Sequence, residues 1–132
     1  MDNETRGRHL TVTAFCHASA VAQLNDANFL AALLHESIDA VGMKVLVPAQ
    51  MVRVPLDRTK RQGPKDCGGV TGVAILSTSH VSIHTWPLHQ RVSFDLYSCQ
   101  DFDADRVLEL LKDRLKLTGG EIVTVARGGR PD

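Results

Sequence analysis

Two segments, residues 80–84 and 91–97, alternate apolar and polar side chains and are joined by a short stretch that contains Pro87. Strict alternation is typical of β-strands that pack one face on a core. Val81 and Ile83 are therefore predicted to face the core. The opposite, polar face collects the side chains that could carry chemistry: His80, Ser82, His84, Ser93, Asp95 and Tyr97, with Cys99 next in the same alternation.

The other apolar patterns of the chain predict further strands and two helices. Pro48 interrupts one strand pattern, which indicates an edge strand or a bulge there because proline cannot donate to a β-ladder. Apolar residues at helical spacing indicate the helices. The predicted strands are 9–16, 43–55, a buried strand at 70–76 and a final strand at 121–126, and the predicted helices are 27–41 and 104–117.

The first helix is expected to begin after Asn25 or Asp26 and to end at Gly42, since Asn and Asp cap helix N-termini and glycine adopts the left-handed stop. On that helix, His35 and Glu36 are expected to face solvent. The second helix is expected to begin after Asp101 or Asp103 and to end at Gly119 and Gly120.

This order of elements predicts an α+β fold, a two-layer sandwich in which an antiparallel sheet carries two helices on one face. A length of 132 residues predicts a single domain over 1–132. A domain of this size gains only moderate stability from its own core, so burial of one sheet face against a second copy is plausible. Residues 56–69 lack periodicity and are expected to form an exposed loop, with the basic run 58–61 solvated.

Composition excludes several classes of protein. The chain has 15 basic and 15 acidic side chains, which argues against a nucleic-acid binder. No apolar run is long enough to cross a bilayer, and the N-terminus has no secretory signal, so a cytoplasmic protein without membrane contact is expected. Three cysteines at wide spacing, Cys16, Cys67 and Cys99, suggest free thiols rather than a disulfide framework.

Short motifs resemble the prokaryotic S-adenosylmethionine decarboxylase proenzyme family. They are Gly69-Val70-Thr71-Gly72, Ser79-His80, Ile83-His84-Thr85-Trp86-Pro87 and Cys99, with Arg8-His9-Leu10 near the N-terminus. The serine is followed by a histidine five positions later and a cysteine twenty positions later. The resemblance covers most of the chain and implies a homodimer, with pockets near the subunit interface, that acts in polyamine biosynthesis.

The resemblance implies self-cleavage between Thr78 and Ser79 into chains 1–78 and 79–132. The Ser79 hydroxyl would attack the carbonyl carbon of Thr78, and His84 would remove the α-proton of Ser79, which leaves a covalent pyruvoyl group at position 79. Thr71, where the family has serine, would be the oxyanion donor. The pyruvoyl ketone would form a Schiff base with the α-amino group of a small substrate and accept electrons as CO₂ leaves, and Cys99 would be the general acid.

Three positions depart from the family pattern. Thr78 replaces a glutamate, but its backbone carbonyl is the group attacked. Leu88 replaces the glutamate that the resemblance assigns to the ribose hydroxyls, and Lys65 stands where an aromatic residue would stack on adenine. A leucine leaves buried hydroxyls unpaired, which costs about 1–3 kcal/mol each. L-Arginine or L-ornithine is therefore the preferred substrate, with S-adenosylmethionine, which supplies aminopropyl groups for spermidine, as the alternative.

Blander interpretations accompany each of these residues. Trp86 could line the substrate pocket or belong to the core, and Asp57, Asp66 or Asp101 could pair with the distal cation of a basic substrate. A zinc site at His80, His84 and His89 is weakly supported, because no pair of carboxylates stands near them, and no metal is expected. An uncleaved homologue that serves as a non-catalytic regulatory subunit remains a further alternative.

Overall fold

The computed structural model describes residues 6–56 and 68–128. In chain order, the elements are β1 Gly7–Cys16, the 3₁₀ turn Ala18–Ala20, α1 Val21–Leu24, α2 Ala27–Val41, β2 Val45–Arg53, β3 Val70–Leu76, β4 Ser79–Trp86, the 3₁₀ turn Pro87–His89, β5 Arg91–Ser98, α3 Ala104–Leu115 and β6 Leu117–Arg127. The predicted α+β class and its strands are confirmed. Residues 57–67, which hold most of the expected loop, lie outside the description.

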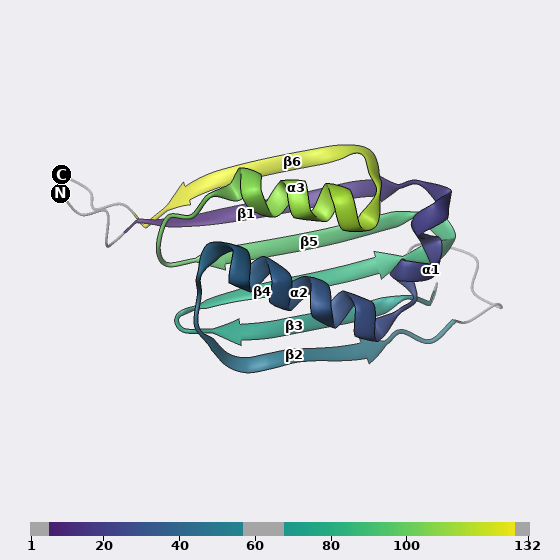
Figure 1. The fold of residues 1–132 in the computed structure, drawn as a ribbon, viewed down its shortest axis with the longest axis horizontal. Coiled ribbons are helices and arrows are strands. Elements are labelled where there is room, and N and C mark those ends of the chain that lie inside the picture. The colour runs from purple at the N-terminus through teal and green to yellow at the C-terminus, as the bar shows by residue number, and fades with distance from the viewer. Residues whose placement is uncertain (1–5, 57–67, 129–132) are drawn as a thin grey trace.

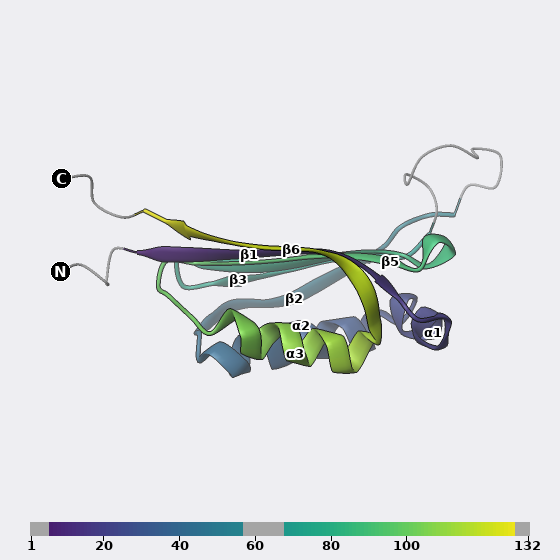
Figure 2. The ribbon, with the colours of Figure 1, turned by 90° about the horizontal axis from the view of Figure 1, so that it is seen from above.

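The strands form one antiparallel sheet in the order β2-β3-β4-β5-β1-β6 (Figure 1). Figure 2 shows α2 and α3 on the same side of this sheet, and in Figure 1 the two helices lie side by side. Within the described part of the chain, the opposite face carries no helix, and we call it the open face. The predicted two-layer sandwich is thereby confirmed.

The core lies between the sheet and the two long helices. Phe94 of β5, Leu10 of β1 and Leu33 of α2 are at most 1% exposed. Burying a side chain of this size contributes roughly 1.5–3 kcal/mol. The expectation of a fully buried 70–76 strand was wrong, because Val73 and Ile75 of β3 are 39% and 47% exposed on the open face.

Helix α2 follows its sequence signals. Asp26 accepts a hydrogen bond from the Phe29 N–H at 3.0 Å, and Gly42 has the left-handed φ of 68°. The expectation that His35 faces solvent was wrong: its Nε2 accepts the Ala49 N–H of β2 at 3.2 Å, so the side chain joins helix to strand. Glu36 is partly exposed and is ion-paired with Arg114 of α3.

Helix α3 begins after Asp103 as predicted, but it ends at Lys116, whose φ is 52°. The two glycines expected to end it lie within β6. Gly120 serves close packing of strands, since a Cβ there would lie 2.3 Å from the Thr13 carbonyl oxygen of β1. At the other sheet edge, the register of β2 shifts between Val45 and Val47 and again between Val47 and Gln50, across Pro48. The prediction of an edge strand or a bulge at Pro48 is confirmed on both counts.

No helix in the described ranges is both long and apolar enough to span a membrane.

Candidate active site

The turn between β3 and β4 has an unusual backbone. Ser77 and Thr78 connect the two strands, with Leu76 paired to Ser79. Thr78 has a φ of 57°, a left-handed conformation that β-branched residues rarely adopt. Such a residue stores on the order of 1–3 kcal/mol of strain. The strain lies at the residue whose carbonyl forms the peptide bond with Ser79.

Cys99 meets this turn from the end of β5. Its N–H donates to Ser79 Oγ at 3.1 Å, and its Sγ lies 2.8 Å from Thr78 Oγ1. Thr78 Oγ1 donates its one proton to the Ser77 carbonyl at 2.6 Å, which leaves the thiol as the donor toward Thr78. The Ser79 hydroxyl, the Cys99 thiol and the left-handed Thr78 backbone therefore lie together.

A pocket of about 280 Å³ surrounds these three residues. The turn from α2 to β2 forms its second wall, which the sequence analysis did not single out. The lining residues are Val41, Gly42, Met43, Lys44, Ser77, Thr78, Ser79, Ser98, Cys99, Gln100 and Asp101. The pocket is large enough for an amino-acid head group beside Ser79.

Thr71 and His84 form a second pair at the other end of the β3–β4 hairpin. The two residues lie opposite each other in the antiparallel register, and Thr71 Oγ1 is 3.0 Å from His84 Nδ1. His84 is exposed on the open face together with His80, as the alternation predicted. The ring of Trp86 lies 6.3 Å from the His84 ring, and the Arg91 guanidinium stacks over the indole at 4.8 Å.

The two pairs do not meet within one chain. Ser79 is the first residue of β4 and His84 is the sixth, so about 17 Å of strand separates them at roughly 3.3 Å per residue. Within one chain, the Ser79 hydroxyl and the Cys99 thiol therefore do not lie beside the His84 imidazole, although alternation placed His84 and Cys99 on the same face. Alternation fixes the face of each side chain, but it says nothing about position along a strand.

Leu88 lies near the second pair, in the 3₁₀ turn after β4, and is 67% exposed. It lines a pocket of about 250 Å³ together with Asn25, Arg53, Val54, Leu56, Gly68, Gly69 and Pro87. Among the described residues of this pocket there is one cation, Arg53, and no carboxylate. Lys65, Asp57 and Asp66 fall outside the described residues.

Asp101 is already engaged by a partner that the sequence analysis did not identify. Arg8 of β1 forms an ion pair with Asp101, and this hydrogen bond lowers the pKa of the Asp101 carboxyl. The alternation of β1 and β5 indicated two strands, but it did not indicate that they are neighbours. Only that adjacency brings Arg8 next to the segment after Cys99.

Near the Ser79 end of the strands, the open face holds a group of rings from three neighbouring strands. His9 of β1 and His80 of β4 both lie about 6 Å from the Tyr97 ring of β5. His9 Nε2 is 3.3 Å from a carboxylate oxygen of Asp95. The described residues contain no group of three or more His, Cys, Asp or Glu side chains that could hold a metal ion.

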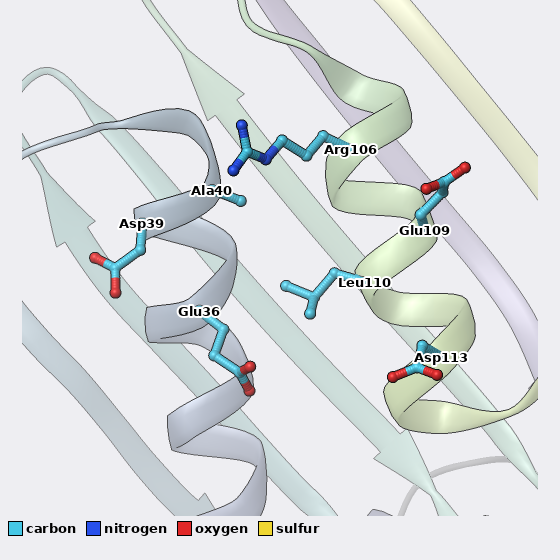
Figure 3. Close-up of a pocket in the computed structure, with 7 residues that line it drawn as sticks. All are labelled: Glu36, Asp39, Ala40, Arg106, Glu109, Leu110 and Asp113. Atoms are coloured by element: carbon cyan, nitrogen blue, oxygen red, sulfur yellow. The ribbon is translucent and has the colours of Figure 1, made fainter.

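A larger groove of about 540 Å³ lies on the outer side of the two helices, away from these residues. Its charged lining residues are Glu36 and Asp39 of α2 and Arg106, Glu109 and Asp113 of α3, and Figure 3 shows the Arg106 side chain extending toward α2. Arg114 pairs with both Glu36 and Asp113. These interactions join the two helices and leave the groove outside the chemistry at Ser79.

Comparison with known proteins identifies the family and supports the fold. The sequence profile described as S-adenosylmethionine decarboxylase matches residues 8–128. A solved adenosylmethionine decarboxylase from Aquifex aeolicus superposes with a TM-score of 0.65 at 21% identity, over 94% of this chain and 90% of that one. At that identity the structural match supports the fold alone.

Sequence relatives are more informative about the family. A protein of Halalkalibacterium halodurans named S-adenosylmethionine decarboxylase proenzyme 2 is 31% identical over 129 residues, which cover 97% of this chain and 91% of the relative. Proenzymes of Geobacillus and Methanococcus aeolicus are 40% and 36% identical over segments that span 51% and 59% of their lengths. Each is named for S-adenosylmethionine, so the comparisons do not support the basic amino-acid substrate. The chain belongs to the S-adenosylmethionine decarboxylase family, whose members are made as proenzymes and act as pyruvoyl-dependent carboxy-lyases.

Proposed function

We propose that residues 1–132 form one catalytic domain, which cleaves itself between Thr78 and Ser79 and then decarboxylates S-adenosylmethionine for polyamine biosynthesis. The observation that carries the proposal is the left-handed Thr78 backbone at the bond to be broken, with Ser79 Oγ and Cys99 Sγ beside it. The products are chains 1–78 and 79–132. A cytoplasmic location fits the substrate of such an enzyme.

In the first step, Ser79 Oγ attacks the carbonyl carbon of Thr78 while its proton passes to the Ser79 nitrogen, which turns the amide into an ester. Relief of the left-handed Thr78 conformation favours this shift. His84 then removes the α-proton of Ser79, and the Cβ–O bond breaks. Residues 1–78 leave with a C-terminal carboxylate, and position 79 becomes a dehydroalanine. Water then attacks the α-carbon of this residue and releases its nitrogen as ammonia, which leaves the pyruvoyl carbonyl.

The pyruvoyl carbonyl supplies the electron sink for decarboxylation. Cys99 provides the proton that replaces CO₂ on the substrate carbon, since its thiol points at the turn and carries a transferable proton. Thr71 donates to the oxyanion that forms at Thr78 during cleavage. Trp86 borders His84 and contributes an aromatic wall for the substrate.

The site is assembled from two copies of the chain. His84 and Thr71 lie about 17 Å along the sheet from Ser79 and Cys99, so a single chain cannot bring them to one bond. A twofold axis perpendicular to the strands places the Ser79 end of one sheet beside the His84 end of the other. Such an isologous dimer has two identical sites, each with both pairs.

The open face is suited to this role. Polar side chains of β4, β5 and β1 occupy the middle strands of the open face, and exposed apolar side chains lie on the strands at either side. These are Val47 and Val52 of β2, Val73 and Ile75 of β3, and Val123 and Val125 of β6. Six strands spaced about 4.8 Å apart give a face of roughly 700 Å², close to the 800 Å² that each partner buries in a standard interface.

Mixing two inactive variants tests the shared site. In a dimer of one Ser79→Ala chain and one His84→Ala chain, one site carries both substitutions and the other carries neither. Co-expression should therefore restore cleavage of the His84→Ala chain and about half of the normal turnover per mixed dimer, while each variant alone stays inactive. If co-expression restores nothing although mixed dimers are isolated, all four residues act within one chain.

S-Adenosylmethionine is the substrate that the described pocket at Leu88 favours. The distal cation of arginine or ornithine would meet Arg53 there and no described carboxylate. The distal part of S-adenosylmethionine is a neutral adenosine, because its sulfonium charge lies between that part and the amino-acid part. Release of CO₂ from labelled S-adenosylmethionine, L-arginine and L-ornithine decides among them. Turnover of either amino acid above that of S-adenosylmethionine would contradict the assignment.

The Leu88→Glu variant tests whether the substrate reaches the pocket at Leu88. A carboxylate at position 88 would accept hydrogen bonds from ribose hydroxyls, so KM for S-adenosylmethionine should fall roughly tenfold, the effect of about 1.4 kcal/mol. Leu88→Gln is the matched control for size. If neither variant changes KM, the substrate does not reach this pocket.

Denaturing mass spectrometry separates the enzyme from a non-catalytic subunit. Purified protein should give two masses, residues 1–78 and a fragment from 79 onward whose first residue is a pyruvoyl group rather than serine. Ser79→Ala should give one intact chain. A single full-length mass for the unchanged protein would favour the regulatory-subunit alternative.

A further inference from the structure

The segment that carries Cys99 connects β5 to α3 and contains no helix or strand of its own. Cys99 places both its N–H and its thiol on the Thr78–Ser79 turn. Two residues later, Asp101 pairs with Arg8 of β1. We propose that Arg8 and Asp101 are positioning residues that hold this segment so that the Cys99 thiol faces the reacting bond. This inference rests on the proposed function of Cys99.

Arg8 is well placed for that task. It lies directly opposite Ser98, the last residue of β5, in the antiparallel register of β1 and β5. Its side chain is 28% exposed, so its reach across the strand end is confined. Asp101 Oδ1 also accepts the N–H of Phe102 at 2.9 Å, which fixes the carboxylate on its own backbone.

The backbone of β1 also packs closely against the start of the segment that carries Cys99. A Cβ at Gly7 would lie 2.4 Å from the Ser98 carbonyl oxygen and 3.4 Å from the Cys99 Cα, so the strands touch closely there. Ser98 Oγ accepts the Gln100 N–H at 3.0 Å. Cys99 is thus held on its N-terminal side by β1 and β5, and Asp101 with Arg8 holds the C-terminal side.

The ion pair acts on geometry rather than on overall stability. Asp101 is 62% exposed, and pairs this exposed add little to the free energy of unfolding. Arg8 lowers the pKa of Asp101, so the carboxylate remains ionised throughout the neutral range and the restraint does not titrate there. A shift of the thiol by about 1 Å would reduce turnover by tenfold or more.

The test compares Arg8→Gln, Asp101→Asn and the double variant with the unchanged protein. Each should lower kcat for decarboxylation roughly tenfold with KM altered less than about twofold, and the double variant should lose no more than either single variant. The rate of iodoacetamide alkylation at Cys99, followed by peptide mass spectrometry, should rise severalfold. Arg8→Lys, which keeps the charge, should recover part of both effects.

Arg114→Gln is the matched control, because it breaks an exposed ion pair between α3 and α2 away from Cys99. It should leave kcat and alkylation unchanged. Alkylation and kcat within twofold of the unchanged protein in both single variants, or the same change in Arg114→Gln, would overturn the inference. If the unchanged protein decarboxylates none of the three substrates, the proposed function fails, whereas alkylation of Cys99 still decides whether Arg8 and Asp101 position it.

Discussion

Thr78 combines a β-branched side chain with a left-handed backbone, and both properties matter for the bond that follows it. Thr78→Gly should remove the strain, because glycine adopts a positive φ without steric cost. We expect the uncleaved chain to gain about 1 kcal/mol in the free energy of unfolding and to cleave itself at least severalfold more slowly.

The Ser79→Ala background permits the stability measurement without cleavage, and gel analysis of freshly synthesised chain gives the cleavage rate. Thr78→Ala is the control for the side chain, since it removes the hydroxyl beside Cys99 but keeps a Cβ in the left-handed region. Faster cleavage in Thr78→Gly than in the unchanged chain would show that the strain does not assist the reaction.

Ionisation of Cys16 should lower the free energy of unfolding at alkaline pH. The side chain is 1% exposed, and burial raises the pKa of its thiol to about 11. In the unfolded chain the thiol ionises near pH 9, so between pH 9 and 11 the unfolded state binds fewer protons than the folded state. The free energy of unfolding should therefore fall in this range, by a contribution on the order of 2 kcal/mol, and keep its full value below pH 9.

Urea denaturation at pH 8, 9.5 and 10.5 measures this contribution as the difference between the unchanged protein and Cys16→Ala. The difference should shrink as pH rises, because alanine cannot titrate. A difference that stays constant up to pH 10.5 would mean that Cys16 is not protected from ionisation by the fold.

At the scale of helices and strands, a single buried hydroxyl joins three elements. Thr85 Oγ1 donates to the Leu24 carbonyl at the end of α1 at 2.7 Å and accepts the Val70 N–H of β3 at 2.9 Å. Thr85→Val keeps the shape but leaves both backbone groups unpaired, which should cost about 2–4 kcal/mol. Thr85→Ser keeps the hydroxyl and should lose at most about 1.5 kcal/mol, so a similar loss in both variants would contradict this role.

Most elements could be predicted from periodicity and capping residues, because each signal is local. Helix α2 runs from Ala27 to Val41, between the caps Asp26 and Gly42, as its sequence indicated. The order of strands could not be predicted, since alternation alone does not specify neighbours, and the contact between Arg8 and Asp101 depends on that order. The end of α3 was missed because Lys116 takes the left-handed conformation that the sequence suggested for a glycine.

The roles of the candidate site residues stay predictions, but the structure shows which of them lie together. Cys99 contacts both Thr78 and Ser79. Thr71 and His84 meet each other at the far end of the same hairpin. Five residues of extended chain form a fixed length, so β4 keeps His84 about 17 Å from Ser79 of the same chain. If the site is shared between two copies as we propose, dimer formation is a condition of both cleavage and turnover.

A charge placed on the open face should therefore abolish dimer and activity together. Ile75→Glu puts a carboxylate at the centre of β3, where the side chain is 47% exposed, and burying it against a second sheet costs about 3 kcal/mol or more. Association should weaken at least a hundredfold. Light scattering should then give the mass of a single chain, 14.4 kDa, and the chain should remain uncleaved.

Ile122→Glu is the control for this substitution. Ile122 of β6 is 42% exposed but pairs with buried Val12, so it lies on the helix side of the sheet. It should leave the dimer, the cleavage at Ser79 and the turnover as they are, and the far-ultraviolet circular dichroism of both variants should match that of the unchanged protein. Cleavage by a folded Ile75→Glu monomer would show that one chain completes the site by itself, and the separation of His84 from Ser79 would then have to close within a single sheet.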